Sequence, residues 1–347
     1  MYILKGRRGK AIRRKAVAEL AGVSEATVSR VLNGVGPIKE ATRQRVLEAA
    51  RQLNYVPSAL ARQFARSKSG NLGVVLPLLP KVNVFSTYYF SEILSGIGYT
   101  AKQCGYDLLL LFREPDEPRE YSRLFQTQKV DVCIILGAQD VPEERAAIAE
   151  LQAAEHPFCL INQRFDGLQV NSVDADHRLG SFKVTAHLLE RGRSRIIFLN
   201  GPDVYSNSVD RLAGFRQALA EAGREAAAVM TGNYSRKSGY ALAARCAAMI
   251  RAGEADAIIA ANDRMAIGLQ QGLEECGLRA GTDYALAGGD DSEGARLMNP
   301  PLTSLAVPFF EMGREAASRL LAGLEQEERQ EAFDIRLAVK LVVRASS

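Results

Sequence analysis

The chain has 347 residues, 47% of them hydrophobic and 24% charged, a composition typical of a globular protein with two or three domains. No stretch approaches 18 consecutive apolar residues, so no membrane span is expected. The basic N-terminus lacks the apolar core of a secretory signal peptide, which argues against export.

Positive charge is concentrated at the N-terminal end. Residues 1–70 carry fifteen Lys and Arg against four Asp and Glu, a net charge of +11, whereas the rest of the chain carries a net charge of −7. Such a block is typical of a surface that binds nucleic acid. A solvated basic tail is the alternative.

The cysteines and histidines indicate neither disulfides nor a metal site. The five cysteines are an odd number, are widely spaced and form no Cys-x-x-Cys pair. The three histidines share no metal-ligand spacing. We therefore predict no metal, no cofactor and a reducing, cytoplasmic environment.

The basic region contains the pattern of a helix-turn-helix. Residues 16–21 have apolar side chains at helical spacing and end at Gly22, which can adopt a positive φ. Ser24 then stands where the N-cap of a second helix over residues 25–33 belongs, and a third helix is expected over about residues 39–53. In this motif the start of the second helix meets base edges in the major groove.

The residues of this region resemble a known family. LAGVS-x-x-TVSRVLN at residues 20–33, followed by LNY-x-P-x-A-x-A at residues 53–61, is similar to the signature of the lactose-repressor/galactose-repressor (LacI/GalR) family. The resemblance continues to the end of the chain. It implies a DNA-binding transcriptional regulator, most often a repressor, whose operator affinity a small-molecule effector controls.

The resemblance also implies roles for individual residues. Three side chains would read bases: Glu25, Ala26 and Arg30. Of these, the Arg30 fork can bond guanine O6 and N7 together. Three others would bind phosphates and fix the register on DNA: Ser24, Thr27 and Ser29.

Residues 57–66 resemble the hinge helix of the family, which folds when it pairs with its dimer mate on DNA. Ala61 would allow close approach of the two helices, and Phe64 stands where the family has a Leu wedge in the minor groove. Packing of Phe64 on its own domain is the alternative. We expect a DNA-binding domain over residues 1–56, a hinge and linker over 57–70, and a core over 71–347.

The core pattern predicts parallel α/β sheets. Apolar runs at residues 72–76, 107–111, 132–136, 158–161, 196–199, 257–260 and 284–287 alternate with helical segments. A break near residues 171–174 suggests two doubly wound lobes, and the resemblance implies a periplasmic-binding-protein-like core whose chain crosses between them three times. The expected lobes are about 71–172 with 306–335, and 173–305 with 336–347.

Ligands of such folds bind outside the carboxyl ends of the strands, so we expect a cleft between the lobes. The resemblance assigns five effector-binding residues: Asn162, Arg211, Asn262, Asp290 and Phe309. Many relatives have Asp where Asn162 stands. The residues that follow two strand ends, Asp263 and Asp291, are expected to cap helices.

One Arg, two amides, a carboxylate and an aromatic ring suit a sugar or a sugar derivative, although several relatives bind purines or other effectors. Four further aromatics could add stacking or belong to the core or the dimer surface: Phe85, Tyr88, Tyr89 and Phe90.

The expected assembly is a homodimer, without a tetramerising tail, on pseudo-palindromic double-stranded DNA. Two other classes of protein compete with this interpretation. A periplasmic sugar-binding protein would need an export signal and would lack the helix-turn-helix. A sugar-modifying enzyme would need a phosphate loop or paired acids, and neither pattern is present, so no catalytic residue is assigned.

Overall fold

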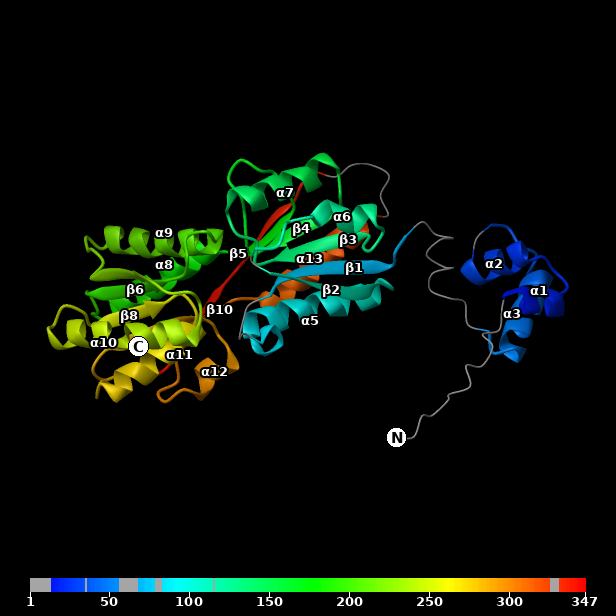
Figure 1. Ribbon diagram of the computed structural model, residues 1–347. Coiled ribbons are helices and arrows are strands. Elements are labelled where there is room, and N and C mark those ends of the chain that lie inside the picture. Colours follow the sequence, from blue (N-terminus) through cyan, green and yellow to red (C-terminus); the bar gives the residue numbers. More distant parts are fainter. Residues whose placement is uncertain (1–13, 35, 56–67, 79–82, 115, 325–330) are drawn as a thin grey trace, which may run out of the picture. The chain divides into compact units, whose positions relative to one another are not determined.

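The computed structural model describes residues 14–34, 36–55, 68–78, 83–114, 116–324 and 331–347. The chain divides into two compact units, Met1–Gly70 and Asn71–Ser347 (Figure 1). We call them the head and the core, and each is described by itself.

Within its described residues, the head contains three helices, α1 (Arg14–Ala21), α2 (Glu25–Asn33) and α3 (Glu40–Gln52). Gly22 follows α1 with a φ of 65°, and the Ser24 side chain caps α2 by accepting a hydrogen bond from the backbone N–H of Thr27. A small apolar core joins the helices through Val17, Ala18, Ala21, Val28, Val31, Val46, Ala49 and Ala50. The predicted helix-turn-helix and third helix are confirmed.

The first lobe of the core is built on a six-stranded parallel sheet of order β11-β5-β4-β3-β1-β2. Its strands are β1 (Asn71–Pro77), β2 (Asp107–Arg113), β3 (Val132–Leu136), β4 (Phe158–Ile161), β5 (Ser172–Ala175) and β11 (Asp334–Leu337). Helices α5 (Tyr88–Gln103) and α13 (Phe309–Gly323) cover one face, and α6 (Tyr121–Gln126) and α7 (Pro142–Ala153) cover the other (Figure 1). A short 3-10 turn, η1 (Val84–Ser86), precedes α5.

The second lobe has a six-stranded sheet of order β12-β10-β9-β8-β6-β7, in which only β12 runs antiparallel to its neighbour among the described strands. Its strands are β6 (Ile196–Asn200), β7 (Ala228–Thr231), β8 (Ala257–Ala260), β9 (Ala285–Asp290), β10 (Thr303–Ala306) and β12 (Lys340–Val342). Helices α8 (His177–Glu190) and α9 (Ser206–Glu221) cover one face; α10 (Arg236–Arg251) and α11 (Asp263–Glu275) cover the other, with α12 (Glu293–Leu297) beside α11.

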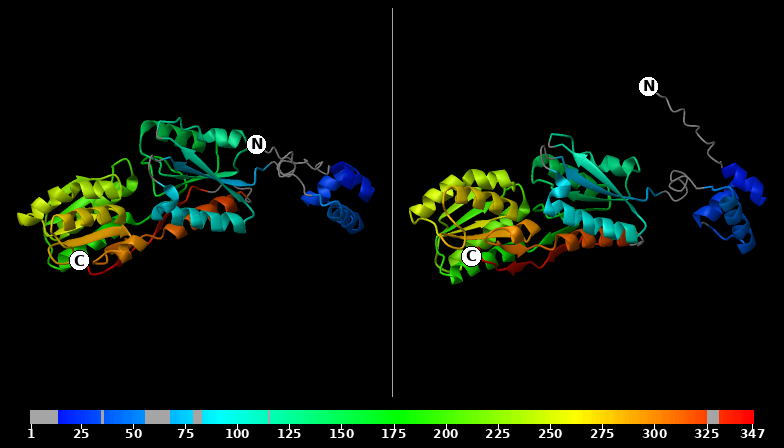
Figure 2. Two further views of the ribbon diagram at one scale, coloured as in Figure 1. Left: turned by 60° about the horizontal axis from the view of Figure 1, so that its bottom comes forward. Right: turned by 90° about the horizontal axis from the view of Figure 1, so that it is seen from below.

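The chain passes between the lobes three times, after β5, after β10 and between β11 and β12 (Figure 2). This agrees with the expected fold class of two doubly wound subdomains. The expected lobe boundary near residue 172 falls at the start of β5, however, and β5 pairs with β4 in the first sheet. The first crossing therefore follows Ala175, and the last follows Leu337 because β11 also belongs to the first sheet.

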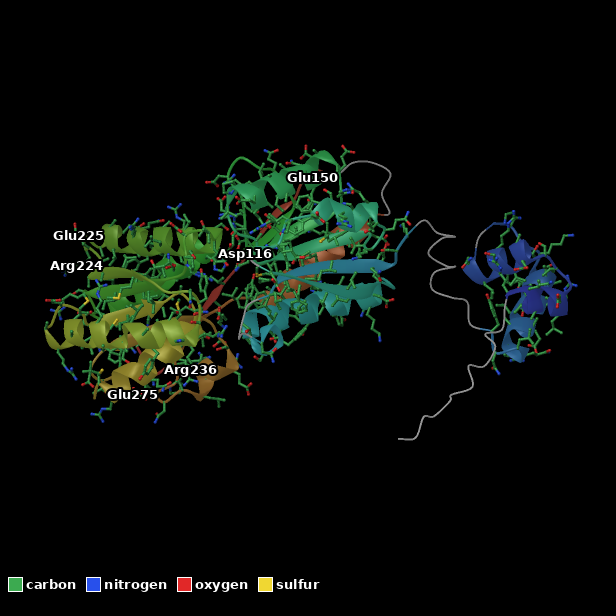
Figure 3. All side chains as sticks on the ribbon, in the orientation of Figure 1. Asp116, Glu150, Arg224, Glu225, Arg236 and Glu275 are labelled. Atoms are coloured by element: carbon green, nitrogen blue, oxygen red, sulfur yellow. The ribbon has the colours of Figure 1, made fainter. Side chains whose placement is uncertain are left out.

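Exposed charged side chains such as Glu150 and Arg224 cover the outside of the core (Figure 3). Within the described ranges, no helix combines the length and apolar character needed to cross a bilayer, and no His, Cys, Asp and Glu side chains gather into a possible metal site. The five cysteines are free thiols, three of them buried.

Candidate functional site

Helix α2 buries Val28 and Val31 against the rest of the head and presents its opposite face to solvent. Four of the six residues predicted to contact DNA are exposed, namely Ser24, Glu25, Ala26 and Arg30, and the other two, Thr27 and Ser29, are half-buried. The structure therefore brings all six to the start and one side of a single helix.

The contacts of these side chains differ. The Ser24 Oγ accepts from the Thr27 N–H at 3.1 Å and lies 2.9 Å from the Thr27 hydroxyl, which fixes the first turn of α2. The Arg14 Nε donates to a Glu25 carboxylate oxygen at 3.3 Å. Within the described part of the chain, Arg30 makes no side-chain hydrogen bond or ion pair, so its fork has all of its donors available. The predicted minor-groove residues, Ala61 and Phe64, lie outside the described residues.

The five predicted effector residues come from both lobes. Asn162 follows β4 and Phe309 begins α13 in the first lobe, whereas Arg211 lies in α9, Asn262 follows β8 and Asp290 ends β9 in the second lobe. All five are buried, with exposed fractions between 2% and 8%. Three of them, Asn162, Asn262 and Asp290, lie at or just after the carboxyl ends of strands, where the ligand rule for doubly wound sheets places a binding site.

Hydrogen bonds connect these residues across the lobes. The Asn207 side-chain N–H donates to the backbone carbonyl of Asn162 at 3.2 Å, and the Arg211 Nη1 donates to Asn207 Oδ1 at 3.2 Å. Asn207 belongs to α9, so it joins the end of β4 in the first lobe to Arg211 in the second.

Tyr234, which follows β7, is the second connecting residue. Its hydroxyl accepts from Arg211 Nη1 at 3.2 Å and donates to Asn207 Oδ1 at 2.8 Å, and its ring lies 5.8 Å from the Arg211 guanidinium carbon. The Asn262 side-chain N–H donates to the Tyr234 carbonyl at 3.1 Å. Burial raises the pKa of the Tyr234 hydroxyl, which is therefore protonated and can donate.

A buried histidine and acid stand behind Asn162. The His177 Nε2 lies 2.5 Å from Asn162 Oδ1 and 3.3 Å from Asp174 Oδ1. Burial, followed by the Arg211 charge, lowers the pKa of His177. Burial alone would raise the pKa of Asp174, but hydrogen bonding to His177 and the charges of His177 and Arg164 bring it below its usual value.

We call the connected residues Asn162, Asn207, Arg211, Tyr234 and Asn262 the Arg211 cluster. The aromatic residues lie partly beside this cluster and partly in the apolar core. Phe309 makes edge contacts with Tyr89 and Tyr88, at centroid distances of 5.1 and 6.1 Å. Burial raises the pKa of the Tyr89 hydroxyl. Of the other two candidates, Phe90 is buried in the core, and Phe85 is exposed and packs on Phe112.

Two helix caps differ from the prediction. Asn262, not Asp263, caps α11 by accepting from the Met265 N–H at 3.0 Å. Asp263 is instead fully buried and accepts three hydrogen bonds from Ser292 and Ser304. The reason is register: α11 begins at Asp263 itself, one residue earlier than expected.

Asp291 is likewise not a cap, because Ser292 caps α12. Its carboxylate instead forms an ion pair with the Arg296 guanidinium at 3.0 Å and a second ion pair with Arg344. The acid after β9 therefore holds the C-terminal segment against the second lobe.

Asp290 and Asp263 form a pair of neighbouring buried carboxyls. Burial raises the pKa of Asp290 well above its ordinary value, and the nearby Asp263 raises it further. Burial also raises the pKa of Asp263, to about 6, against the hydrogen bonds from Ser304 and Ser292. Asp290 also adopts a φ of 125°, a region that side-chain-bearing residues rarely occupy.

The residues that sequence reasoning missed are Asn207, Tyr234, His177 and Asp174. Asn207 lies one helical turn before Arg211, a spacing that could have identified it. Tyr234 was missed because β7 was not predicted.

A hollow of about 1460 Å³ lies mainly along the first lobe, is also lined by Arg178 and Asp210 of the second lobe, and contains none of the five predicted residues. It runs beside the loop that joins β4 to β5 and beside β11, and Phe165, Arg319 and Phe333 are among its lining residues.

Comparison with known proteins identifies relatives of both units. Residues 15–58 match the family described as "Bacterial regulatory proteins, lacI family", and residues 185–347 match the "Periplasmic binding protein-like domain". The chain is 34% identical to Catabolite control protein A of Streptococcus mutans, covering 91% of this chain and 92% of the relative. It is 33% identical to the HTH-type transcriptional regulator CelR of Thermobifida fusca, covering 95% and 96%.

Solved structures of transcriptional regulators are also similar to this chain over nearly its whole length. The Lac repressor dimer bound to operator and the anti-inducer ONPF superposes with a TM-score of 0.83 at 29% identity, covering 97% of this chain and 99% of that chain. A complex of the transcriptional regulator CelR with cellobiose superposes with a TM-score of 0.71 at 31% identity, covering 97% and 100%.

Proposed function

The chain belongs to the LacI family of bacterial regulatory proteins and is a DNA-binding transcriptional regulator, and from this premise we propose that a sugar or sugar derivative bound between the lobes of its core sets its affinity for an operator. The contacts of the Arg211 cluster support this proposal, because they join the two lobes through side chains that also suit a sugar.

The observation that carries the proposal is the hydrogen-bond chain from Asn162 through Asn207 to Arg211 and Tyr234. Each of these groups can bond a sugar hydroxyl as well as its present partner. A ligand that replaces these partners changes the contacts between the lobes, so it stabilises one arrangement of the lobes over another. That difference in binding is the source of allosteric coupling.

Effectors of two similar proteins are of this class. A CelR structure contains cellobiose, and an Enterococcus faecium LacI-family structure contains ribose. For this chain we assign the effector contacts to Asn162, Arg211, Asn262 and Asp290, with Phe309 as an aromatic surface on which a sugar ring could stack. These groups bind rather than react, so we infer regulation without catalysis.

On DNA, we assign base reading to Glu25, Ala26 and Arg30, and phosphate contacts to Ser24, Thr27 and Ser29. The exposed face of α2 supports this assignment. The insertion of Phe64 into the minor groove, and the close approach of two hinge helices at Ala61, stay predictions from the family resemblance. A homodimer would place two copies of α2 in successive major grooves of a pseudo-palindrome. We infer that the protein acts in the cytoplasm, because the DNA that it binds is there.

Selection from random duplexes tests the DNA half of the proposal. The purified full-length protein should enrich a near-palindrome whose half-sites lie about one helical turn apart. Recovery of unenriched DNA at low salt, where electrostatic binding is strongest, would contradict sequence-specific binding.

The effector half is tested on the enriched duplex. A panel of sugars is first screened for those that raise the unfolding temperature, and each hit is then added to an operator-binding titration. The proposal expects at least one hit to change the operator Kd by about 5- to 150-fold, the usual range of allosteric coupling. Hits that stabilise the protein but leave operator affinity unchanged would contradict it.

A further inference from the structure

The Arg211 guanidinium is a buried positive charge whose contacts are all neutral. It is 7% exposed, and its hydrogen bonds go to the Asn207 amide oxygen and the Tyr234 hydroxyl. Within the described part of the chain, no carboxylate lies within 4 Å of it. Both hydrogen bonds leave from Nη1, so Nε and Nη2 remain available as a parallel pair of donors.

The carboxylates near Arg211 are committed to other cations. Arg164 pairs with Asp210 and lies 3.5 Å from Asp174, which also contacts His177. Asp291, beyond the end of β9, holds Arg344 and Arg296. None of these acids is free to neutralise Arg211 without abandoning its present partner.

Asp290 is the one acid at the cluster that has no cation partner within ion-pair distance in the described residues, and it does not supply the missing charge. Its side chain neighbours the Asp263 carboxyl, and two adjacent buried carboxyls do not ionise together. Asp263 accepts three hydrogen bonds, from the Ser292 N–H and from the hydroxyls of Ser292 and Ser304, so the shared negative charge is best stabilised there. Burial and the neighbouring Asp263 raise the pKa of Asp290, which favours the protonated form that can donate a hydrogen bond.

The ligand contacts on the first-lobe side are neutral as well. Asn162 is an amide, Tyr89 is a protonated hydroxyl and Phe309 is apolar. The cluster therefore offers one unpaired cation, donors on Arg211 and Asp290, and no accessible negative charge. A buried charge without a counter-charge is costly, and a neutral ligand would leave that cost in place.

We propose that the effector of this protein is an anion, a sugar acid or a sugar phosphate whose carboxylate or phosphate pairs with Nε and Nη2 of Arg211. The proposal rests on the proposed function, since it concerns the same site, and it specifies the charge of the ligand. Carboxylate and phosphate each present two oxygen acceptors that an Arg fork can bind. The experiment below uses a separate probe for each group.

The test uses full-length protein and three probes that differ only at C6: D-galactose, D-galacturonate and D-galactose 6-phosphate. Inorganic phosphate is a fourth probe that carries the charge without the sugar. Binding is followed through the unfolding temperature of the core at constant ionic strength, because a ligand of the folded state raises it. Sodium chloride at matched ionic strength is the reference.

Three variants locate the binding. Arg211→Gln removes the charge and should weaken each anionic probe by at least about 100-fold, the loss of two charge-assisted hydrogen bonds. Arg211→Lys keeps the charge without the fork, so it should retain phosphate better than carboxylate. Arg216→Gln, at an exposed position on the same helix, is the matched control and should behave as wild type.

The outcomes are distinct. Stabilisation by inorganic phosphate that Arg211→Gln loses and Arg216→Gln keeps supports the proposal, and a response to only one of the two acidic sugars identifies the anionic group. Equal stabilisation of wild type and Arg211→Gln, no response of wild type to any anion, or galactose binding as tightly as its acidic forms overturns it. In the last case the proposed sugar effector survives, whereas operator affinity that is insensitive to every ligand contradicts the proposed function itself.

Discussion

Arg30 is the residue at which sequence specificity should be most concentrated. It projects from α2 without a partner in the described structure, whereas Glu25 already receives Arg14 and Ser24 is engaged as a cap. A bidentate Arg–guanine contact contributes about 1–3 kcal/mol of discrimination.

Arg30→Ala should therefore lower the ratio of specific to non-specific affinity by about 5- to 150-fold, the equivalent of that energy. Fluorescence anisotropy on the selected operator and on a scrambled duplex measures it. Arg51→Ala, in the exposed last turn of α3, is the control and should not change the ratio. An unaltered ratio in Arg30→Ala would remove this residue from base reading.

The raised pKa of Asp290 predicts how the stability of the folded protein changes with pH. The ordinary pKa of the carboxyl is 3.8, and in the folded protein it lies well above that value because of burial and then of Asp263. Between the two values the folded state holds a proton that the unfolded state has released. Stability consequently falls as pH rises, by up to about 1.4 kcal/mol per pH unit.

Asp290→Asn has no such proton. The free energy of unfolding of the variant, relative to wild type, should increase steadily from about pH 4 towards pH 7. Urea denaturation at a series of pH values measures this difference. A difference that does not change with pH would mean that Asp290 is ionised in the folded protein.

Among single residues, the sequence identified those that lie within family motifs better than those that only contact them in the folded chain. Arg211, Asn262 and Asp290 were assigned because motifs flank them. Tyr234 and His177 were missed because their roles depend on contacts that only the folded chain creates, between segments far apart in sequence. The exchanged roles of Asn262 and Asp263 have a similar origin, since helix starts are uncertain by a residue or two.

At the scale of elements, the start of α9 is bound to the first lobe by a set of polar contacts that we call the seam. The Ser206 N–H donates to Gln163 Oε1 at 2.8 Å, and the Arg164 N–H donates to the Ser206 hydroxyl at 3.0 Å. The ion pair between Arg164 and Asp210 completes it. Since Arg211 follows in the same helix, the seam positions the cluster as well as holding the lobes together.

Asp210→Asn breaks the one ion pair of the seam and leaves Arg164 partly buried beside Asp174. The free energy of unfolding should fall by about 1–2 kcal/mol, between the values typical of exposed and buried pairs. Glu311→Gln breaks an exposed Glu–Arg pair within α13 and should change it by less than about 0.5 kcal/mol. Equal losses in the two variants, measured by urea denaturation, would show that the seam does not stabilise the core.

The accuracy of strand prediction depended on hydrophobicity. All seven predicted strands were found because each is largely a continuous apolar run, as in VCIIL of β3. The strands β5, β7, β10, β11 and β12 were missed, because each has four residues or fewer and most contain polar residues, as in DIRL of β11. Their pairing is set by the sheet to which they add, which a local pattern does not encode.

At the scale of the whole molecule, charge and chemistry are divided between two units. The net charge of +11 lies in residues 1–70, which include the head, and the remainder is net negative. Electrostatic contacts with DNA should therefore belong to the head, and operator affinity should fall steeply with salt. Under the proposed function, ligand recognition belongs to the core, at the carboxyl ends of its strands.

The central claim is that occupancy of the Arg211 cluster changes operator affinity. It is tested most directly by titrating one operator duplex with full-length protein, with and without a ligand identified by the thermal screen, for wild type and Arg211→Gln. The ligand should shift the operator Kd of wild type at least about fivefold, whereas Arg211→Gln should bind the same operator without responding to the ligand. An equal response of both proteins would contradict it.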